Sequence, residues 1–178
     1  MGESAYERLM HGARTPQAPL TLALAGVLSR SGIAGLAADE IERLRRRHFP
    51  AVTAEDAACL SRPQEGCLAL RAEEGGDLVA LLLDHADTKD EDTRWLAQAV
   101  ATACLQDNHL WQDMGLPSRD VLSALLKRYF RALYRKNTRN MKWKKFFYRQ
   151  LCESAQVPLC QAPSCAACAD FPVCFGSE

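Results

Sequence analysis

Residues 90–104 read DEDTRWLAQAVATAC, and their apolar side chains recur at the spacing of one face of an α-helix. The residues on this face are Trp95, Leu96, Ala99, Val100, Ala103 and Cys104. The acidic residues at positions 90–92 place negative charge at the positive end of the helix dipole, which stabilises a helix. This stretch therefore predicts a helix that buries one face in a protein core.

The same helical spacing continues on both sides of this stretch. It predicts helices over residues 19–30 and 39–47, and a longer helix over residues 118–134 with Ser118 as its N-cap. Asn140 is expected to cap the last helix of the chain. These elements make the chain predominantly helical.

Two segments are less clear, and no pair of strands is recognisable. Residues 50–77 are the most loop-like part of the first half, since they contain two Pro and three Gly. The apolar run over residues 78–85 fits a helix or a strand, and we assign it to a helix because helices flank it. We expect an all-α fold, in which a compact helical domain (residues 1–154) and an irregular Cys-rich tail (residues 155–178) form one structural unit.

Length and composition agree with this fold class. A chain of 178 residues is long enough for one domain that buries roughly 70% of its unfolded surface. Hydrophobic residues at 48% and charged residues at 25% exclude a disordered or collagen-like chain. The apolar runs are far shorter than the roughly 20 residues that cross a bilayer, and the first residues lack the pattern of a secretory signal. We therefore expect a cytoplasmic protein that does not bind membranes.

The net charge of zero hides an uneven distribution of charge along the chain. Residues 1–126 contain 12 Lys and Arg against 19 Asp and Glu. Residues 127–149 contain 10 Lys and Arg and no acidic residue, whereas residues 150–178 contain three acidic residues and no Lys or Arg. A stretch of 23 residues without a single carboxylate is a strong local concentration of positive charge.

The cysteines are also unevenly distributed, since five of the eight lie within the last 27 residues. Four of them, Cys160, Cys165, Cys168 and Cys174, follow the pattern C-x4-C-x2-C-x5-C. In a reducing cytosol such a cluster favours metal binding over disulfides. Two thiolates separated by two residues can hold one metal ion or one edge of a cluster, because the short loop brings both sulfurs to one side.

The spacing leaves three interpretations of this cluster open. The C-x4-C-x2-C part resembles the plant-type ferredoxin spacing of an iron–sulfur cluster. A structural zinc site usually has two C-x2-C pairs, or one pair and two His, and here there is one pair and no His after residue 109. Unmetallated thiols are the third interpretation.

Two further residues are possible additional metal ligands. Cys152 would lie near the end of the last helix, where it is either a fifth thiolate or a residue of the core. His109 is either a ligand or proton donor near the cluster, or a polar residue satisfied near a helix start. The core and helix-start interpretations are the commoner ones for such residues.

The basic segment, residues 127–149, also contains seven aromatic residues: Tyr129, Phe130, Tyr134, Trp143, Phe146, Phe147 and Tyr148. Alternating cations and rings can bind nucleic acid, but these rings fall at the spacing of a helix core, which favours burial. The cations lack acidic partners at i±4 within the segment. They therefore need acidic residues from elsewhere in the fold, an acidic partner or a small oxyanion.

Three blocks of the chain together resemble the NifQ family of nitrogen-fixation proteins. They are residues 108–113 (NHLWQD), residues 140–150 (NMKWKKFFYRQ) and the four-cysteine tail, in the order of the family. The resemblance covers about the last 70 residues. Two residues depart from the family pattern, since Met114 stands where Leu is expected and Arg131 stands where Pro is expected.

The resemblance implies a carrier and not an enzyme. It implies that Cys160, Cys165, Cys168 and Cys174 hold a molybdenum–iron–sulfur cluster of the Mo-3Fe-4S or 3Fe-4S type. The molybdenum, taken up as molybdate, would then be donated to assembly of the nitrogenase iron–molybdenum cofactor. The implied partners are the cofactor-assembly scaffold complex and the nitrogenase iron protein. Our hypothesis is that four cations either attract molybdate or dock an acidic scaffold protein; they are Lys142, Lys144, Lys145 and Arg149.

Two other functions compete with this interpretation. The tail and the basic helix could form a zinc-stabilised module that binds nucleic acid or protein. Cys165 and Cys168 could instead belong to a thiol redox enzyme, but the βαβ setting typical of such enzymes is not recognisable. Neither a phosphate-binding loop nor a dinucleotide-binding fingerprint is present, so conventional catalysis has little support.

Overall fold

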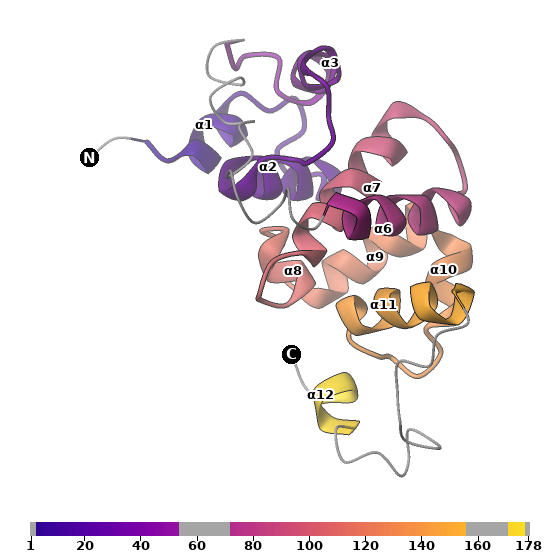
Figure 1. The fold of residues 1–178 in the computed structure, drawn as a ribbon. Helices are drawn as coiled ribbons and strands as arrows, with labels where there is room; N and C mark the ends of the chain where they lie inside the picture. The colour runs from indigo at the N-terminus through magenta and orange to yellow at the C-terminus, as the bar shows by residue number, and fades with distance from the viewer. Residues whose placement is uncertain (1–2, 54–71, 156–170, 177–178) are drawn as a thin grey trace.

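The structure is a computed structural model that describes residues 3–53, 72–155 and 171–176. Over these ranges all regular secondary structure is helical (Figure 1), which confirms the predicted all-α fold. In chain order the helices are α1 (Ala5–His11), α2 (Pro19–Ser31), α3 (Ala38–His48), α6 (Ala72–Asp84), α7 (Glu91–Cys104), α8 (Leu110–Asp113), α9 (Arg119–Tyr129), α10 (Arg131–Lys136), α11 (Trp143–Ser154) and α12 (Phe171–Phe175).

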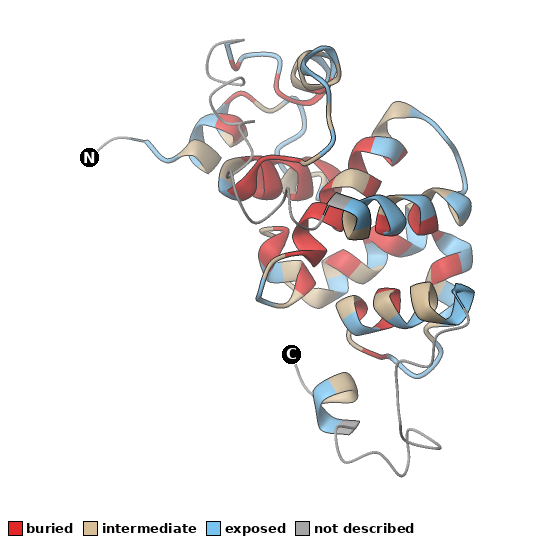
Figure 2. Ribbon diagram, in the orientation of Figure 1, coloured by how far each residue is buried: buried red, intermediate tan, exposed pale blue. Residues whose placement is uncertain are grey.

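Helix α7 forms the centre of the core, where it packs against α2 and α6. Ten of its fourteen residues are buried, including all six on the predicted apolar face (Figure 2). Its N-cap is Asp90, whose carboxylate accepts a hydrogen bond from Thr93 N at 2.8 Å. This backbone hydrogen bond stabilises the charged carboxylate and lowers the pKa of Asp90.

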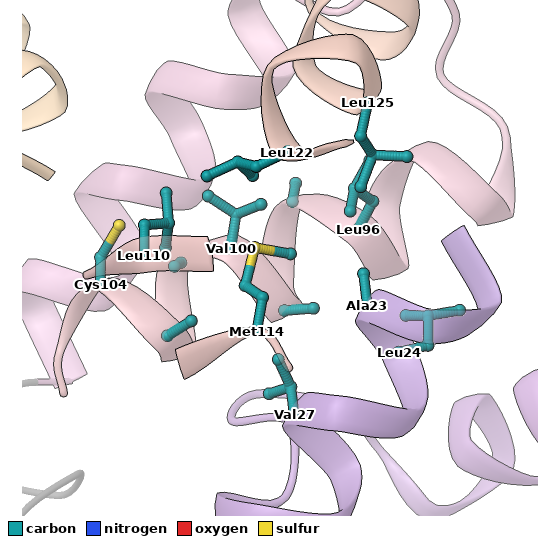
Figure 3. Packing of buried hydrophobic residues seen from close by; sticks show 14 of the residues in the cluster. Ala23, Leu24, Val27, Leu96, Val100, Cys104, Leu110, Met114, Leu122 and Leu125 are labelled. Carbon is teal, nitrogen blue, oxygen red and sulfur yellow. The ribbon is translucent and has the colours of Figure 1, made fainter. Parts of the chain in front are cut away.

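Helix α2 fixes the position of the short helix α8. Figure 3 shows Met114, which follows α8, between Val100 of α7 and Val27 of α2. At Gly26 the two segments approach so closely that a Cβ atom would lie 2.1 Å from Met114 O. Arg30 Nη1 adds a hydrogen bond of 2.6 Å to Gln112 O. Only glycine permits this close approach. The approach and the hydrogen bond from Arg30 together hold α8 against α2.

The predicted single helix over residues 118–134 is wrong, because the structure divides it into α9 and α10. Phe130 leaves the helical conformation with φ −131° and ψ 52°, and its ring is fully buried. Arg131 N then donates to Asp87 Oδ2 at 3.2 Å, which satisfies the first amide of α10. The helix breaks here although the sequence has no Gly or Pro at this point. Burial of Phe130 and the hydrogen bond to Asp87 explain the break. Ser118 caps α9 as predicted.

Three other boundaries differ from the predictions. Asn140 does not cap the last helix: it has a φ of 54°, and Lys142 is the N-cap of α11. Helix α6 begins at Ala72, so residues 72–77 are not a loop; Glu73 and Glu74 in its first turn favour a helix start. The predicted irregular tail ends in the short helix α12.

The N-terminal helix α1 was not predicted from the sequence, although it begins with a capping box. Ser4 Oγ accepts from Glu7 N at 3.2 Å, and Glu7 Oε2 accepts from Ser4 N at 2.7 Å. The rest of the predicted loop, residues 54–71, lies outside the described residues. None of the helices in the described ranges is long and apolar enough to span a membrane.

Candidate functional site

The structure describes only part of the predicted cysteine cluster. Cys160, Cys165 and Cys168 lie outside the described residues. Cys174 lies in α12, and the possible fifth thiolate, Cys152, lies in α11; both are half-buried. Among the residues that the structure describes, no three His, Cys, Asp or Glu side chains come together in a group that could hold a metal ion.

Helix α12 is attached to the helical body at the turn that precedes α11. Lys142 N donates a hydrogen bond of 2.9 Å to Cys174 O. The guanidinium of Arg139 lies 5.5 Å from the centroid of the Phe175 ring. Cys174 and Phe175 both pack against the hydrophobic core. The last of the four tail cysteines is therefore held beside residues 139–142.

Hydrogen bonds hold this turn in one conformation. The Asn137 amide bridges the turn, since its Oδ1 accepts from Met141 N and its Nδ2 donates to Met141 O, each at 2.8 Å. Arg119 Nη2 donates to the carbonyls of Asn140 and Met141 at 3.2 and 3.0 Å. Asparagine adopts the left-handed conformation at position 140 more readily than most residues do. The turn to which α12 is attached is therefore held in place by these hydrogen bonds.

The first motif block, residues 108–113, is built around the Asp113 carboxylate, whose side chain is 6% exposed. Asn108 donates to it twice, from its backbone N at 3.1 Å and from Nδ2 at 3.0 Å. Lys144 Nζ lies 2.5 Å from Asp113 Oδ2 and also donates to Gln106 O at 2.7 Å. The structure thus commits Lys144, one of the four cations of our hypothesis, to an internal ion pair.

His109 is the N-cap residue of α8 and is half-buried. Its backbone N donates to Gln112 Oε1 at 3.2 Å, and its imidazole has no hydrogen-bond partner within the described part of the chain. Beside it, the buried Trp111 Nε1 has no hydrogen-bond acceptor among the described residues. His109 therefore occupies the helix-start position that the sequence suggested, and its role as a metal ligand stays a prediction.

The three remaining cations of the hypothesis lie along α11 and its N-cap. Lys142 is half-buried, Lys145 and Arg149 are exposed, and Arg149 Nε pairs with Glu153 Oε1 at 2.7 Å. Neither Lys142 nor Lys145 has a described carboxylate within 4 Å. Lys142 and Lys145 are therefore available to an anion in a way that Lys144 is not.

The aromatic rings of the basic segment are mostly core residues. Trp143 stacks on Tyr134 with centroids 5.8 Å apart, and it also contacts the rings of Phe146 and Phe147. Phe130, Trp143, Phe146 and Phe147 are all buried. The predicted burial is confirmed, and these four rings are not free to stack on bases.

Acidic residues from the first part of the chain balance this basic segment only in part. Within the described residues, two of its ten cations pair with carboxylates from residues 1–126. These are Lys144 with Asp113, and Arg131 with Asp87 at 3.9 Å. Cations without a described carboxylate partner lie on α9 and α10 as well as on α11. The sequence did not predict this, because the partners come from distant segments that only the fold brings together.

Comparison with known proteins identifies the family. A family model described as NifQ matches residues 17–176, which includes all four tail cysteines. The chain belongs to the NifQ family. It is 41% identical over 151 residues to Protein NifQ of Azotobacter vinelandii, covering 81% of this chain and 77% of that protein. It is 37% identical over 144 residues to Protein NifQ of Rhodobacter capsulatus, covering 81% and 76% respectively. No solved structure matches the chain.

The family match confirms the predicted resemblance and links the chain to nitrogen fixation. The structure adds that the first two NifQ blocks and Cys174 of the third are joined by direct contacts. The Asp113–Lys144 ion pair joins the first block to the second, and the hydrogen bond from Lys142 N to Cys174 O joins the second to the tail. The second block therefore contacts both the first block and Cys174 of the tail.

Proposed function

We propose that this chain carries a molybdenum–iron–sulfur cluster on Cys160, Cys165, Cys168 and Cys174 and donates the molybdenum to assembly of the nitrogenase iron–molybdenum cofactor. The observation that carries the proposal is the attachment of Cys174 to the second NifQ block through Lys142. This attachment brings the last cysteine of the pattern next to residues 140–150, the second block that carries the family resemblance. The cluster is cargo, so the chain acts as a carrier and not as an enzyme.

The donor atoms suit such a cargo. Thiolates are soft ligands, and four of them within 15 residues can wrap the iron–sulfur part of one cluster. A cluster with four thiolate ligands is negatively charged, and the nearby Arg139 and Lys142 would stabilise it. A Mo-3Fe-4S cluster and its 3Fe-4S precursor both fit these ligands, and Cys152 or His109 would complete the coordination if a further ligand is needed.

The position of the cysteines suits release as well as binding. A carrier must collect its metal and then give it up, which is easier from a partly exposed segment than from the middle of a core. Cys174 is half-buried on the short helix α12. The receiving partners in this proposal are the scaffold complex for cofactor assembly and the nitrogenase iron protein.

Elemental analysis tests the proposal. The full chain is purified without oxygen, and molybdenum, iron and zinc are measured together with the visible spectrum. We expect iron and molybdenum with a brown cluster absorption, both lost in Cys165→Ala/Cys168→Ala. The matched control, Cys59→Ala/Cys67→Ala, removes two thiols outside the tail and should keep both metals. Stoichiometric zinc without visible absorption would contradict the proposal and favour a zinc-stabilised module.

The cations of α11 give this proposal a second test. Because molybdate is an oxyanion, Lys142, Lys145 and Arg149 should raise its local concentration near the tail. We expect slower molybdenum uptake by Lys142→Gln/Lys145→Gln/Arg149→Gln than by the parent, with the difference shrinking at high salt. Molybdate uptake and donor activity that are unchanged in this variant would rule out the proposed role of these cations.

A further inference from the structure

A hollow of about 380 Å³ lies between the C-terminal half of α9 and helix α10. Its lining consists of Ala124, Lys127, Arg128, Arg131, Tyr134 and Arg135. Four of these six residues are cations, none is acidic, and all four cations are exposed. We call this feature the basic hollow. It is distinct from the cysteines and from the cations of α11.

The carboxylates of the described residues hardly balance the positive charge of the basic hollow. Arg131 has a carboxylate partner, Asp87, at the long distance of 3.9 Å. Lys127 Nζ lies 6.0 Å from the centroid of the Tyr134 ring, and the Arg128 guanidinium lies 5.5 Å from that of Tyr129. Across the described residues, no carboxylate lies within 4 Å of Lys127, Arg128 or Arg135. Cations four residues apart on a helix, such as Arg131 and Arg135, repel one another.

The arginines of helix α3 differ from those of the basic hollow, because carboxylates within the protein pair with them. The four arginines are Arg43, Arg45, Arg46 and Arg47. Glu42 alone serves Arg45 and Arg46, whose hydrogen bonds lower its pKa to about 2. The four arginines of α3 are therefore neutralised locally, whereas the basic hollow offers its charge to an external anion.

The framework of the basic hollow is fixed before any ligand binds. Arg131 N donates to Asp87 Oδ2 at 3.2 Å, and Asp87 N donates to Tyr129 O at 3.0 Å, so one residue holds the junction of α9 and α10. On the other side, Tyr134 stacks on the buried Trp143. The four cations thus project from a rigid corner of the helical body.

The exposure and spread of the charges favour several carboxylates over one small oxyanion. A single exposed ion pair contributes little, typically under about 1 kcal/mol, and a small oxyanion reaches few of the four cations at once. A run of Asp and Glu side chains can pair with all four, and their contributions accumulate. We propose that the basic hollow is the docking site for an acidic surface segment of a partner protein. The proposal goes beyond the carrier function, because it rests on charge alone and holds for any cargo.

A fluorescent peptide of eight glutamates is the probe for this proposal, with binding to the full chain followed by anisotropy. We expect Lys127→Gln/Arg128→Gln/Arg135→Gln to weaken binding about tenfold, since three ion pairs are lost. The matched control is Arg43→Gln/Arg46→Gln/Arg47→Gln, which removes the same charge from α3, where each arginine already has a carboxylate partner, and it should change the affinity less than about threefold. Equal losses in both variants, or no loss in the first, would overturn the proposal.

Cross-linking of the parent protein keeps the test independent of how the variants fold. A reagent that joins carboxylates directly to amines should couple the peptide to Lys127 in preference to Lys142 and Lys145. Preferential coupling to α11 would overturn the proposal.

Three further measurements distinguish the other possible occupants of the basic hollow. Saturation of the basic hollow by molybdate, with displacement of the peptide, would make it an oxyanion site. Tighter binding of a single-stranded oligonucleotide than of the peptide, lost in the first variant, would make it a nucleic-acid site. A dimer of the parent that this variant abolishes would assign the hollow to a second copy of the chain. Each of these results would overturn docking of an acidic partner.

Discussion

Lys144 Nζ and Asp113 Oδ2 lie 2.5 Å apart in an ion pair of which both side chains are largely buried. The pair connects α11 with α8 across 31 residues of sequence, and Asn108 supplies the remaining hydrogen bonds to the carboxylate. Because α12 is attached at Lys142, two residues before Lys144, the pair sets where the cysteine tail joins the helical body. The most buried charge in the NifQ blocks therefore serves positioning.

We expect Asp113→Ala to destabilise the protein by about 2–3 kcal/mol, because it leaves the Lys144 ammonium buried without its carboxylate. Chemical denaturation of the metal-free protein measures this loss. The matched control is Glu153→Ala, which removes the partner of Arg149 from an exposed pair and should cost less than about 1 kcal/mol. Equal losses in the two variants would show that the Asp113–Lys144 pair has no special structural role.

Gly26 and Gly76 give opposite predictions for the same substitution. A Cβ at Gly26 would lie 2.1 Å from Met114 O, so Gly26→Ala must separate α2 from α8 and should destabilise the protein by about 2 kcal/mol or more. A Cβ at Gly76 meets nothing within 4 Å inside α6, so Gly76→Ala should stabilise the protein by about 0.5–1 kcal/mol. Melting temperatures of both variants check the pair of predictions. A stable Gly26→Ala variant would contradict the close approach of the two segments.

The N-cap of α7 predicts a pH dependence of stability. The hydrogen bond from Thr93 N lowers the pKa of folded Asp90 below its ordinary value of 3.8. Its stabilisation is therefore complete above the ordinary pKa and is lost as the pH falls through the lowered pKa. At about pH 7 we expect Asp90→Ala to cost about 1 kcal/mol, and the difference from the parent should shrink as the pH falls below the ordinary pKa of 3.8. A difference that stays constant as the pH falls further below this value would contradict the charged cap.

Cluster binding should order the tail. Since one end of the cysteine pattern is attached at Cys174, closing the other three thiolates around a cluster fixes the chain between α11 and α12. We predict that protease cleaves residues 155–178 more slowly in the cluster-loaded protein than in the metal-free protein. The variant Cys165→Ala/Cys168→Ala should show the metal-free rate under both conditions. Equal protease sensitivity of the loaded and metal-free parent would contradict this prediction.

The sequence predicted the helices whose burial follows from their own periodicity. Helix α7 shows this best, because every residue of its apolar face is at most 3% exposed. The break at Phe130 could not be predicted, since the acceptor that begins α10 is Asp87, 44 residues away in the sequence. Arg131 shows the same limit: it stands where the resemblance led us to expect Pro, and in the structure it is the first residue of α10, a position that Pro also suits.

The sequence predicts which residue types make up the candidate site, but it does not predict which of them contact one another. The spacing of the cysteines and the charge of residues 127–149 are visible in the sequence. Which cations are already paired depends on contacts between distant segments, as with Lys144 and Asp113. For this reason Lys144 could not be told apart from Lys142 and Lys145, and the basic hollow could not be recognised at all.

The central claim is that molybdenum on this chain belongs to a sulfur cluster held by Cys160, Cys165, Cys168 and Cys174. X-ray absorption at the molybdenum edge of protein purified without oxygen tests it most directly, because it identifies the atoms around the metal. We predict sulfur neighbours with iron in the next shell, and loss of this signal in Cys165→Ala/Cys168→Ala. Molybdenum surrounded by oxygen alone, retained in that variant and lost in Lys142→Gln/Lys145→Gln/Arg149→Gln, would contradict it.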